Sequence, residues 1–353
     1  MKVKLGELTK IRTGKLDANA ASEDGTYPFF TCSKEPLRIS TYSYNCECVL
    51  VAGNGDLNAK YYNGKFDAYQ RTYIIESNGD GRLHLPYLYH FMTRYIQELR
   101  KLSIGGVIKY IKLGNLTDAE ISLPSVKEQK DACEKLKKIK NIIDKKEAQI
   151  SYLDNLIKAR FVEMFGNVVV NDKSWPTKPI SSVAPASSPK ITVSENIWLL
   201  NLDMIESQSG KVLDRIIVSK NKINASTCAF DDKNVLYSKL RPYLNKVVLP
   251  DQEGYCTTEL VPLRPSNKLN REFLATLLRS DAFVGYINEK TAGAKMPRVS
   301  MNIFRQFECI LPPITLQEQF SVFYKQVDKS KFALVKSIKL LKKSPFDILL
   351  GLL

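Results

Sequence analysis

The chain has 353 residues, of which 44% are hydrophobic, and its formal net charge is +15. This length predicts two or three domains with real cores, and so basic a protein often meets a polyanion, with nucleic acid more common than a membrane surface. No apolar run approaches the length of a membrane span, and the N-terminus lacks the apolar core of a signal peptide. We therefore expect a cytoplasmic protein with no membrane partner.

Residues 1–124 are predicted to form an α+β domain. Strand-like runs at 47–52 and 71–76 alternate with glycine-rich turns at 53–56 and 78–81. A helix is expected over 86–102, and the segment ends at Leu123-Pro124. The two histidines, His84 and His90, lie on or beside this helix, and we interpret both as structural.

The central segment, residues 125–166, is predicted to be one long helix. It opens with Ser125-Val126-Lys127-Glu128, the pattern of a capping box, and contains neither proline nor glycine before Gly166. About 40 residues at about 1.5 Å each give a helix of about 60 Å, which needs a partner to cover its apolar face. The apolar or small residues follow a heptad seam that is broken at Lys146 and Arg160, and they are Ala132, Leu136, Ile139, Ile143, Ile150, Leu153, Ile157 and Met164.

A second globular domain is predicted over residues 167–313, after a short linker that begins at the helix-stopping Gly166. This half repeats the order of the first half. Val49-Leu50 is echoed by Val235-Leu236, the helix at 86–102 by one at 271–287, and Leu123-Pro124 by Leu311-Pro312 at an offset of 188. Glu128-Gln129 is aligned with Glu318-Gln319 after a gap of two residues. Such a repeat predicts a pseudo-dimer within one chain.

Residues 314–353 are predicted to form a second long helix, opened by a box at Thr315-Leu316-Gln317-Glu318. The helix meets Ser344-Pro345 near its end, which places its final turns in question. Its seam consists of Leu316, Phe320, Phe323, Val327, Leu334 and Leu341, and Ser330 and Ser337 occupy the remaining positions of the heptad repeat. The two seams favour pairing as a coiled coil; the alternative is that each helix packs only on its own domain.

The residues that catalysis or metal binding would need are missing or scattered. The seven cysteines contain no CxxC pair, so we interpret them as reduced thiols, and in a strand Cys46 and Cys48 would face the same side. No GxxxxGK phosphate loop is present, and Pro312-Pro313 does not fit the amino-methylation signature of an adenine methyltransferase. We expect no intrinsic catalysis, no cofactor and no metal site.

Side chains that can read DNA are plentiful on the predicted turns. Arg and Lys pair with guanine, Asn and Gln with adenine, and any cation with phosphate. The most promising segment is 291–298, which the repeat places opposite 103–110. Any one of these residues could be a solvated surface group, but as a set they predict DNA contact. The candidates are Asn54, Asn58, Lys60, Gln70, Arg71, Lys109 and Lys112 in the first domain, and Lys239, Arg241, Lys246, Lys295, Arg298 and Asn302 in the second.

A known family shares the junctions between these segments. The chain resembles the specificity subunit of type I restriction-modification systems at the two Leu-Pro…Glu-Gln boxes and in the linker, at Met164-Phe165-Gly166, Asn171, Lys173 and Trp175-Pro176. The first box departs from the pattern because it has Ser125 where the second has Pro313.

This resemblance implies an α+β fold in which two target-recognition domains each read one half of a split DNA site. It also implies that the two helices form an antiparallel coiled coil that acts as a ruler. Two methyltransferase subunits would dock on this chain, nuclease subunits could join them, and the chain itself would be non-catalytic.

We therefore expect recognition domains at 1–124 and 167–313, with long helices at 125–166 and 314–353, and double-stranded DNA as the ligand. Two other interpretations stay open: a self-sufficient DNA methyltransferase or nuclease, and a non-enzymatic coiled-coil scaffold.

Overall fold

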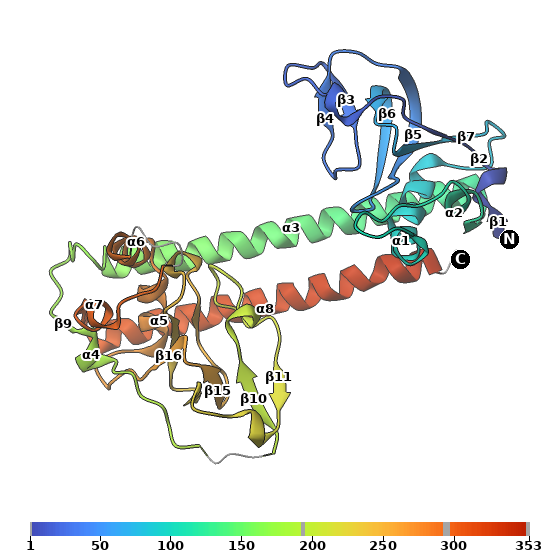
Figure 1. Cartoon of the computed structure of the whole chain (residues 1–353). Coiled ribbons are helices and arrows are strands. Elements are labelled where there is room, and N and C mark those ends of the chain that lie inside the picture. The colour runs from blue at the N-terminus through green and yellow to red at the C-terminus, as the bar shows by residue number, and fades with distance from the viewer. Residues whose placement is uncertain (1, 192–194, 292–296, 351–353) are drawn as a thin grey trace. The chain divides into compact units, whose positions relative to one another are not determined.

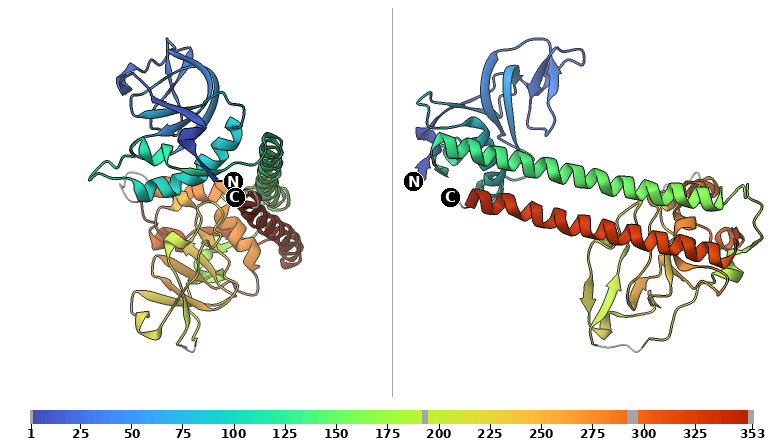
Figure 2. Two further views of the ribbon diagram at one scale, coloured as in Figure 1. Left: turned by 90° about the vertical axis from the view of Figure 1, so that its right-hand side faces the viewer. Right: turned by 180° about the vertical axis from the view of Figure 1, so that it is seen from behind.

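The computed structural model describes residues 2–191, 195–291 and 297–350 (Figure 1). The chain divides into two compact units, one made of residues 1–146 and 336–353 and the other of residues 147–335. The two long helices, α3 (Val126–Phe165) and α8 (Ile314–Leu350), each contribute to both units, and each is an unbroken ribbon (Figure 2). Helix α8 thus continues through Ser344-Pro345. Among the described helices, none combines the length and the hydropathy that crossing a membrane requires.

The first unit is built on a six-stranded sheet with the order β2-β7-β5-β6-β3-β4. A separate pair joins β1 to β8, and α1 (Leu85–Leu102) and the short α2 (Gly114–Thr117) complete the domain. The strands are β1 (Lys2–Lys4), β2 (Thr9–Thr13), β3 (Tyr27–Phe30), β4 (Leu37–Ile39), β5 (Tyr44–Ala52), β6 (Ala59–Ala68), β7 (Thr72–Ser77) and β8 (Glu120–Ser122).

The sheet of the first unit carries an apolar cluster on each of its faces. Val49 and Val51 of β5 pack in one cluster with Leu88 and Met92 of α1. Cys46 and Cys48, on the same strand, belong to the other cluster. This division follows from the alternation of side chains along a strand, and it confirms that the two thiols face the same side.

Helix α1 confirms the helix predicted over 86–102. Its buried residues Leu85, Leu88, Met92, Ile96 and Leu99 recur every three or four positions, which places them on one face. His84 is the N-cap residue, and burial lowers the pKa of both His84 and His90. Neither histidine belongs to a group of metal ligands within the described residues.

The second unit holds a four-stranded sheet, β11-β10-β15-β12, a three-stranded sheet, β14-β13-β16, and the pair β17-β9. The strands are β9 (Thr177–Pro179), β10 (Ile197–Leu200), β11 (Ile216–Val218), β12 (Thr227–Phe230), β13 (Val235–Ser238), β14 (Val247–Val248), β15 (Gly254–Thr257), β16 (Leu260–Leu263) and β17 (Glu308–Ile310). Its shorter helices are α4 (Ile180–Val183), α5 (Arg271–Arg279), α6 (Asp281–Lys290) and α7 (Met301–Arg305).

The single helix predicted over 271–287 is wrong, because Ser280 divides it into α5 and α6. The backbone of Ser280 is extended, with φ −62° and ψ 143°, and its hydroxyl accepts a hydrogen bond from the amide of Phe283. Serine competes with the helix by offering the next turn a side-chain acceptor, so one residue ends α5 and caps α6.

Strand pairing confirms that the two domains are similar. Val49 of β5 pairs with Ile75 of β7, and Val235 of β13 pairs with Leu263 of β16 in the same antiparallel sense. The pair β1-β8 at the base of the first domain has its counterpart in β9-β17 of the second. The fold is therefore α+β with an internal repeat, as expected.

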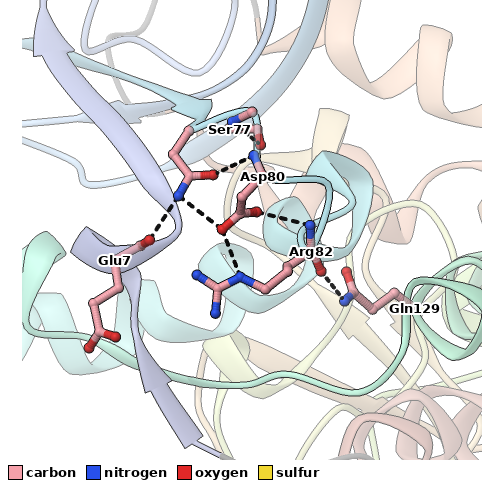
Figure 3. Close-up of polar contacts among 7 residues, drawn as sticks. Glu7, Ser77, Asp80, Arg82 and Gln129 are labelled. Carbon is pink, nitrogen blue, oxygen red and sulfur yellow. Dashed lines mark hydrogen bonds and ion pairs between the residues drawn. The ribbon is translucent and has the colours of Figure 1, made fainter.

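A buried glutamine fastens each long helix to its globular domain. In the first domain, Gln129 donates a hydrogen bond to the carbonyl of Arg82 at 2.8 Å (Figure 3). It also accepts from the amide of His84 at 2.8 Å and donates to the carbonyl of Pro124 at 2.9 Å. Figure 3 also shows the carboxylate of Asp80 accepting a hydrogen bond from the guanidinium group of Arg82. This bond orders the strand-to-helix turn to which Gln129 is hydrogen-bonded.

Gln317 makes the same three contacts in the second domain. It accepts from the amide of Asn270 at 2.9 Å and donates to the carbonyls of Lys268 and Pro312 at 3.2 and 2.7 Å. The alignment of Gln129 with Gln319 is therefore wrong. Gln317 is the equivalent residue, at the offset of 188 that already relates the two Leu-Pro pairs, and no gap is needed.

The two helices begin differently. The capping box of α3 is confirmed, because Glu128 accepts from the amide of Ser125 at 2.8 Å and the hydroxyl of Ser125 faces the amide of Glu128. The box predicted at Thr315 is wrong, since α8 begins at Ile314 and Thr315 already lies inside the helix. The amides of Leu316 and Gln317 bond instead to the carbonyl of Pro313.

In the second unit the end of α3 packs antiparallel against the start of α8. Phe161 and Phe165 lie against Phe320, while Asp154, two turns earlier in α3, pairs with Lys331, about three turns later in α8. All eight predicted seam residues of α3 are buried or half-buried. The predicted break at Arg160 needs correction, because Phe161 beside it occupies the core. Ser330, predicted as a seam position of α8, is exposed, and Lys331 turns inward instead.

The linker after α3 is an ordered cap for the helix. Gly166 has φ +74°, and a Cβ there would lie 2.0 Å from a carboxylate oxygen of Asp172, so only glycine fits. Trp175 donates its ring N–H to the carbonyl of Phe165, Lys173 donates to that of Glu163, and Asn171 bonds the backbone of Trp175 in both directions. The motif residues thus satisfy carbonyls that the helix end leaves open.

The seven cysteines form no disulfide. Cys228 and Cys256 face each other on paired strands with their sulfur atoms 3.4 Å apart.

The glutamine contacts predict a specific loss of stability. Gln317→Ala removes three hydrogen bonds and leaves buried backbone groups unpaired, which costs about 3 kcal/mol and lowers the Tm of the second unit by about 6–12 °C. Gln129→Ala should do the same to the first unit. Gln319→Ala is the matched control, since Gln319 is exposed and should move Tm by less than about 2 °C. Differential scanning calorimetry measures all three, and an equal effect of Gln317→Ala and Gln319→Ala would contradict the assignment.

Candidate nucleic-acid interface

Each domain joins two loops through the same pair of backbone hydrogen bonds. In the first domain, the amide of Gly55 donates to the carbonyl of Lys109 at 3.0 Å, and the amide of Ile111 donates to that of Gly53 at 2.9 Å. We call residues 53–56 together with 103–112 the first loop junction. Asn54 and Tyr110 form an antiparallel bridge within it.

The second loop junction consists of residues 239–245 and 297–302. The amide of Arg241 donates to the carbonyl of Pro297, and the amide of Val299 to that of Lys239, both at 2.8 Å. The bridge in this domain joins Leu240 to Arg298. The repeat thus holds at the level of single hydrogen bonds, and it supports the alignment of 103–110 with 291–298.

Glycine is required in the first junction. A Cβ on Gly53 would lie 2.4 Å from the carbonyl oxygen of Arg71, which also accepts the amide of Gly53, and Gly55 has φ +67°. This tight approach brings Arg71 to the two loops. The side chains of Arg71, Lys109 and Lys112 are exposed, and none forms an ion pair with a residue that the structure describes. Together with the half-buried Asn54, they make a cationic surface with free donors.

Asn58 and Lys60 have a different position from the one predicted. The amide nitrogen of Asn58 donates to the carbonyls of Cys32 and Asp56, both at 2.8 Å, and its oxygen accepts from the ammonium group of Lys60. Burial lowers the pKa of Lys60. Both side chains therefore brace the turn beside the junction. Gln70 is exposed next to Arg71, and its backbone amide bonds to Leu16.

The structure adds an acidic centre that the sequence analysis missed. Asp56 accepts from Arg100 at 3.0 Å and lies 3.7 Å from the ammonium group of Lys34. Nothing in the sequence singles out Arg100, because a cation in the last turn of α1 is ordinary for a helix end. This pairing ties the end of α1 to the turn that carries Asn54.

In the second junction the candidate side chains differ in their exposure and in whether they already have a partner within the protein. Arg241 is exposed, in a left-handed conformation with φ 50°. Arg298 is also exposed, but its guanidinium pairs with Glu259, a residue that the sequence analysis missed and that sets the direction of this side chain. Lys246 donates to the carbonyl of Leu202 at 2.7 Å and is better described as a brace.

Three candidates remain in the second domain. Lys239 is half-buried and supplies both backbone groups that hold Val299 and Glu259. Asn302 is exposed on α7. Lys295 lies outside the described residues.

Such an arrangement can bind a polyanion and read it. Exposed cations supply phosphate contacts, which set affinity, while amide and guanidinium groups on rigid loops can bond base edges. Each junction is rigid because its loops are bonded to each other through the backbone.

Comparison with known proteins identifies the class. The model of the type I restriction modification DNA specificity domain matches residues 1–152 and 163–342, and the chain belongs to this family. It is a DNA-specificity subunit; such subunits are non-catalytic, and catalysis resides in their partner subunits.

Individual relatives agree with this assignment. The specificity subunit of the type I restriction enzyme EcoDI from Escherichia coli is 28% identical over 354 residues, which cover 90% of this chain and 78% of that protein. The S subunit of a type I system from M. genitalium shares the fold with a TM-score of 0.60 at 15% identity, over 100% of this chain and 95% of that one. A chain from a study of complex assembly in a type I system gives 0.61 at 14% identity, over 100% and 97%.

Two cations of the first junction yield a prediction about DNA affinity. Lys109→Ala with Lys112→Ala should make the slope of log K against log salt shallower by about 2, because each lost phosphate contact removes about one released counterion. Neither side chain has a described partner, so Tm should not change. Lys2→Ala with Lys10→Ala removes the same charge from exposed positions on β1 and β2 and should leave the slope as it is. Fluorescence titrations over a salt series measure the slopes, and equal slopes for both double variants would remove the first junction from the interface.

Proposed function

We propose that each globular domain reads one half of a bipartite DNA site through its loop junction, and that the two long helices set the distance between the halves. The repeat of the junction, bond for bond, carries this proposal. Two domains with the same geometry and different side chains in their loops are what two half-sites of different sequence require. The proposed organisation keeps recognition domains at 1–124 and 167–313 and helices at 125–166 and 314–353.

The pairing of α3 with α8 extends, in this proposal, along the whole of both helices. The register supports it. If Phe161 and Phe165 face Phe320 and Asp154 faces Lys331, the same antiparallel step aligns Ile150 with Leu334 and Ile143 with Leu341. All four of the continued positions are apolar and half-buried, as a coiled coil requires.

The partners in this proposal are two methyltransferase subunits, with nuclease subunits added where the system has them, acting in the cytoplasm. The outer faces of the helices support a protein partner. Tyr152 is 73% exposed and Phe332 is 71% exposed, and both belong to the second unit, close in sequence to the paired Asp154 and Lys331. Leu156, one turn from Tyr152, is exposed as well. Tyr152 and Leu156 share one face of α3, and exposed large apolar side chains that lie together in this way mark an interaction site.

Site-specific methylation tests the proposed function. The full chain is co-expressed with a methyltransferase subunit, and methylated adenines are mapped across the host DNA. We expect one split motif, which disappears when the chain is omitted. Methylation by the purified chain alone would favour the self-sufficient enzyme. A chain that selects no motif from random duplexes and adds none to its partner would favour the scaffold.

A change in helix length tests the ruler. One heptad inserted after Ile143 and one after Leu340 preserve the seam at the same level of the proposed coil and add about 10 Å. At about 3.4 Å per base pair, the selected spacing should grow by about three base pairs. These base pairs also turn one half-site by about a third of a turn, so affinity should fall.

The base sequence of each half-site should not change, since neither loop junction is altered. An insertion of three residues in each helix, which breaks the heptad, is the control and should abolish spacing-selective binding. Recovery of the original spacing by the heptad variant would contradict the ruler.

A further inference from the structure

The first loop junction ends in an apolar tip at residues 105–108, Gly105-Gly106-Val107-Ile108. Val107 is fully exposed and Ile108 is 63% exposed. Side chains of this kind are usually buried, and here two adjacent ones project from a loop, with the exposed Ile104 and Tyr110 at its base. Their exposure to water costs free energy in the unbound protein, and exposed apolar side chains of this kind indicate a surface that a ligand covers.

The tip is held rigidly. Ile104 and Tyr110 exchange both backbone hydrogen bonds, at 3.0 and 2.9 Å, so the loop leaves and returns through one antiparallel bridge. Gly105 has φ +114°, and a Cβ there would lie 2.7 Å from the carbonyl oxygen of Ile108, so glycine closes the turn. The hydrogen bond from the amide of Gly55 to the carbonyl of Lys109 fixes this loop to the rest of the junction.

The surroundings of the tip indicate which ligand covers it. Lys109 and Lys112 follow directly and are exposed, and Arg71 lies beside Gly53 at the other end of the junction. An apolar tip with cations at its base is complementary to bases between two phosphate chains. The major groove, about 12 Å wide, has room for such a loop and displays a distinct pattern of groups for each base pair, whereas the minor groove is about 6 Å wide and its pattern is degenerate.

We propose that this tip enters the major groove of the half-site read by the first domain, where Val107 and Ile108 contact the C5-methyl group of thymine. This methyl group is the apolar feature that the major groove displays. The inference rests on the proposed function and adds a base to it: the first half-site contains a thymine recognised by its methyl group. The aligned stretch of the second domain has Lys295 in its sequence, so the two half-sites are read by different chemistry.

Replacement of thymine by deoxyuridine tests the proposal, because it removes only the methyl group. The full chain is titrated with duplexes that carry its selected site, in which each thymine of the first half-site is replaced in turn. At one or two positions we expect binding to weaken about fourfold, the effect of one methyl-sized group. Val107→Ala with Ile108→Ala should weaken binding to the thymine duplex and should no longer distinguish thymine from deoxyuridine.

Two controls separate this contact from a general effect. Val169→Ala with Val170→Ala truncates two adjacent exposed side chains in the linker and should leave both affinities unchanged. The tip variant should keep the Tm of the native chain, because its side chains are exposed.

A first half-site without thymine would overturn the proposal, and so would equal binding of the thymine duplex and all deoxyuridine duplexes by the native chain. It would also be overturned if the tip variant bound the deoxyuridine duplex more weakly than the thymine duplex, because the two losses of affinity would then be additive. The fluorescence of 2-aminopurine placed in the half-site reports unstacked bases. An increase caused by the native chain but not by the tip variant would also overturn the proposal, in favour of insertion between base pairs. Failure of the proposed function is distinct, since the native chain would then select no site.

Discussion

Two buried amide side chains, Gln129 and Gln317, are the contacts on which the organisation of each half depends. Each one lies in the first turns of a long helix and bonds three backbone groups: a carbonyl just before the helix and both sides of the turn that precedes the domain's own helix. A glutamine can satisfy all of these groups because its amide carries an acceptor and two donors. Loss of the amide would leave buried backbone groups unpaired, so the domain and its helix are fastened as one body.

In the second domain this fastening has a second layer. Glu272 of α5 accepts the hydroxyl of Ser321 at 2.9 Å and lies 3.4 Å from the ammonium group of Lys325, while Arg279 reaches the hydroxyl of Tyr324. All three contacts run from α5 to one side of α8. Phe320 of the same helix packs against Phe161 and Phe165 of α3. A helix held this firmly moves together with its own domain, as the proposed ruler requires.

The features that were predicted correctly from the sequence are those that a local pattern determines. The heptad seam, the capping box at Ser125 and the glycine stop at Gly166 depend on neighbouring residues alone. Some errors have a local cause, such as the helix break at Ser280, but others arose where a distant group decides. Gln317 was passed over for Gln319 because its partners lie 47 and 49 residues earlier in the chain. The carbonyl partners of Lys246 and Asn58 are likewise invisible in a sequence.

The loop junctions explain how two domains of low identity can present the same geometry. Every bond that closes a junction joins a backbone amide to a backbone carbonyl. Such bonds place no demand on side chains except where the approach requires glycine, as at Gly53. The side chains of the junction are therefore free to differ: Asn54, Val107 and Lys109 stand in one domain where the other has Leu240, Lys295 and Pro297. Specificity can change in the loops without disturbing the glutamine contacts or the helix seam, because these three parts of the structure use separate sets of atoms.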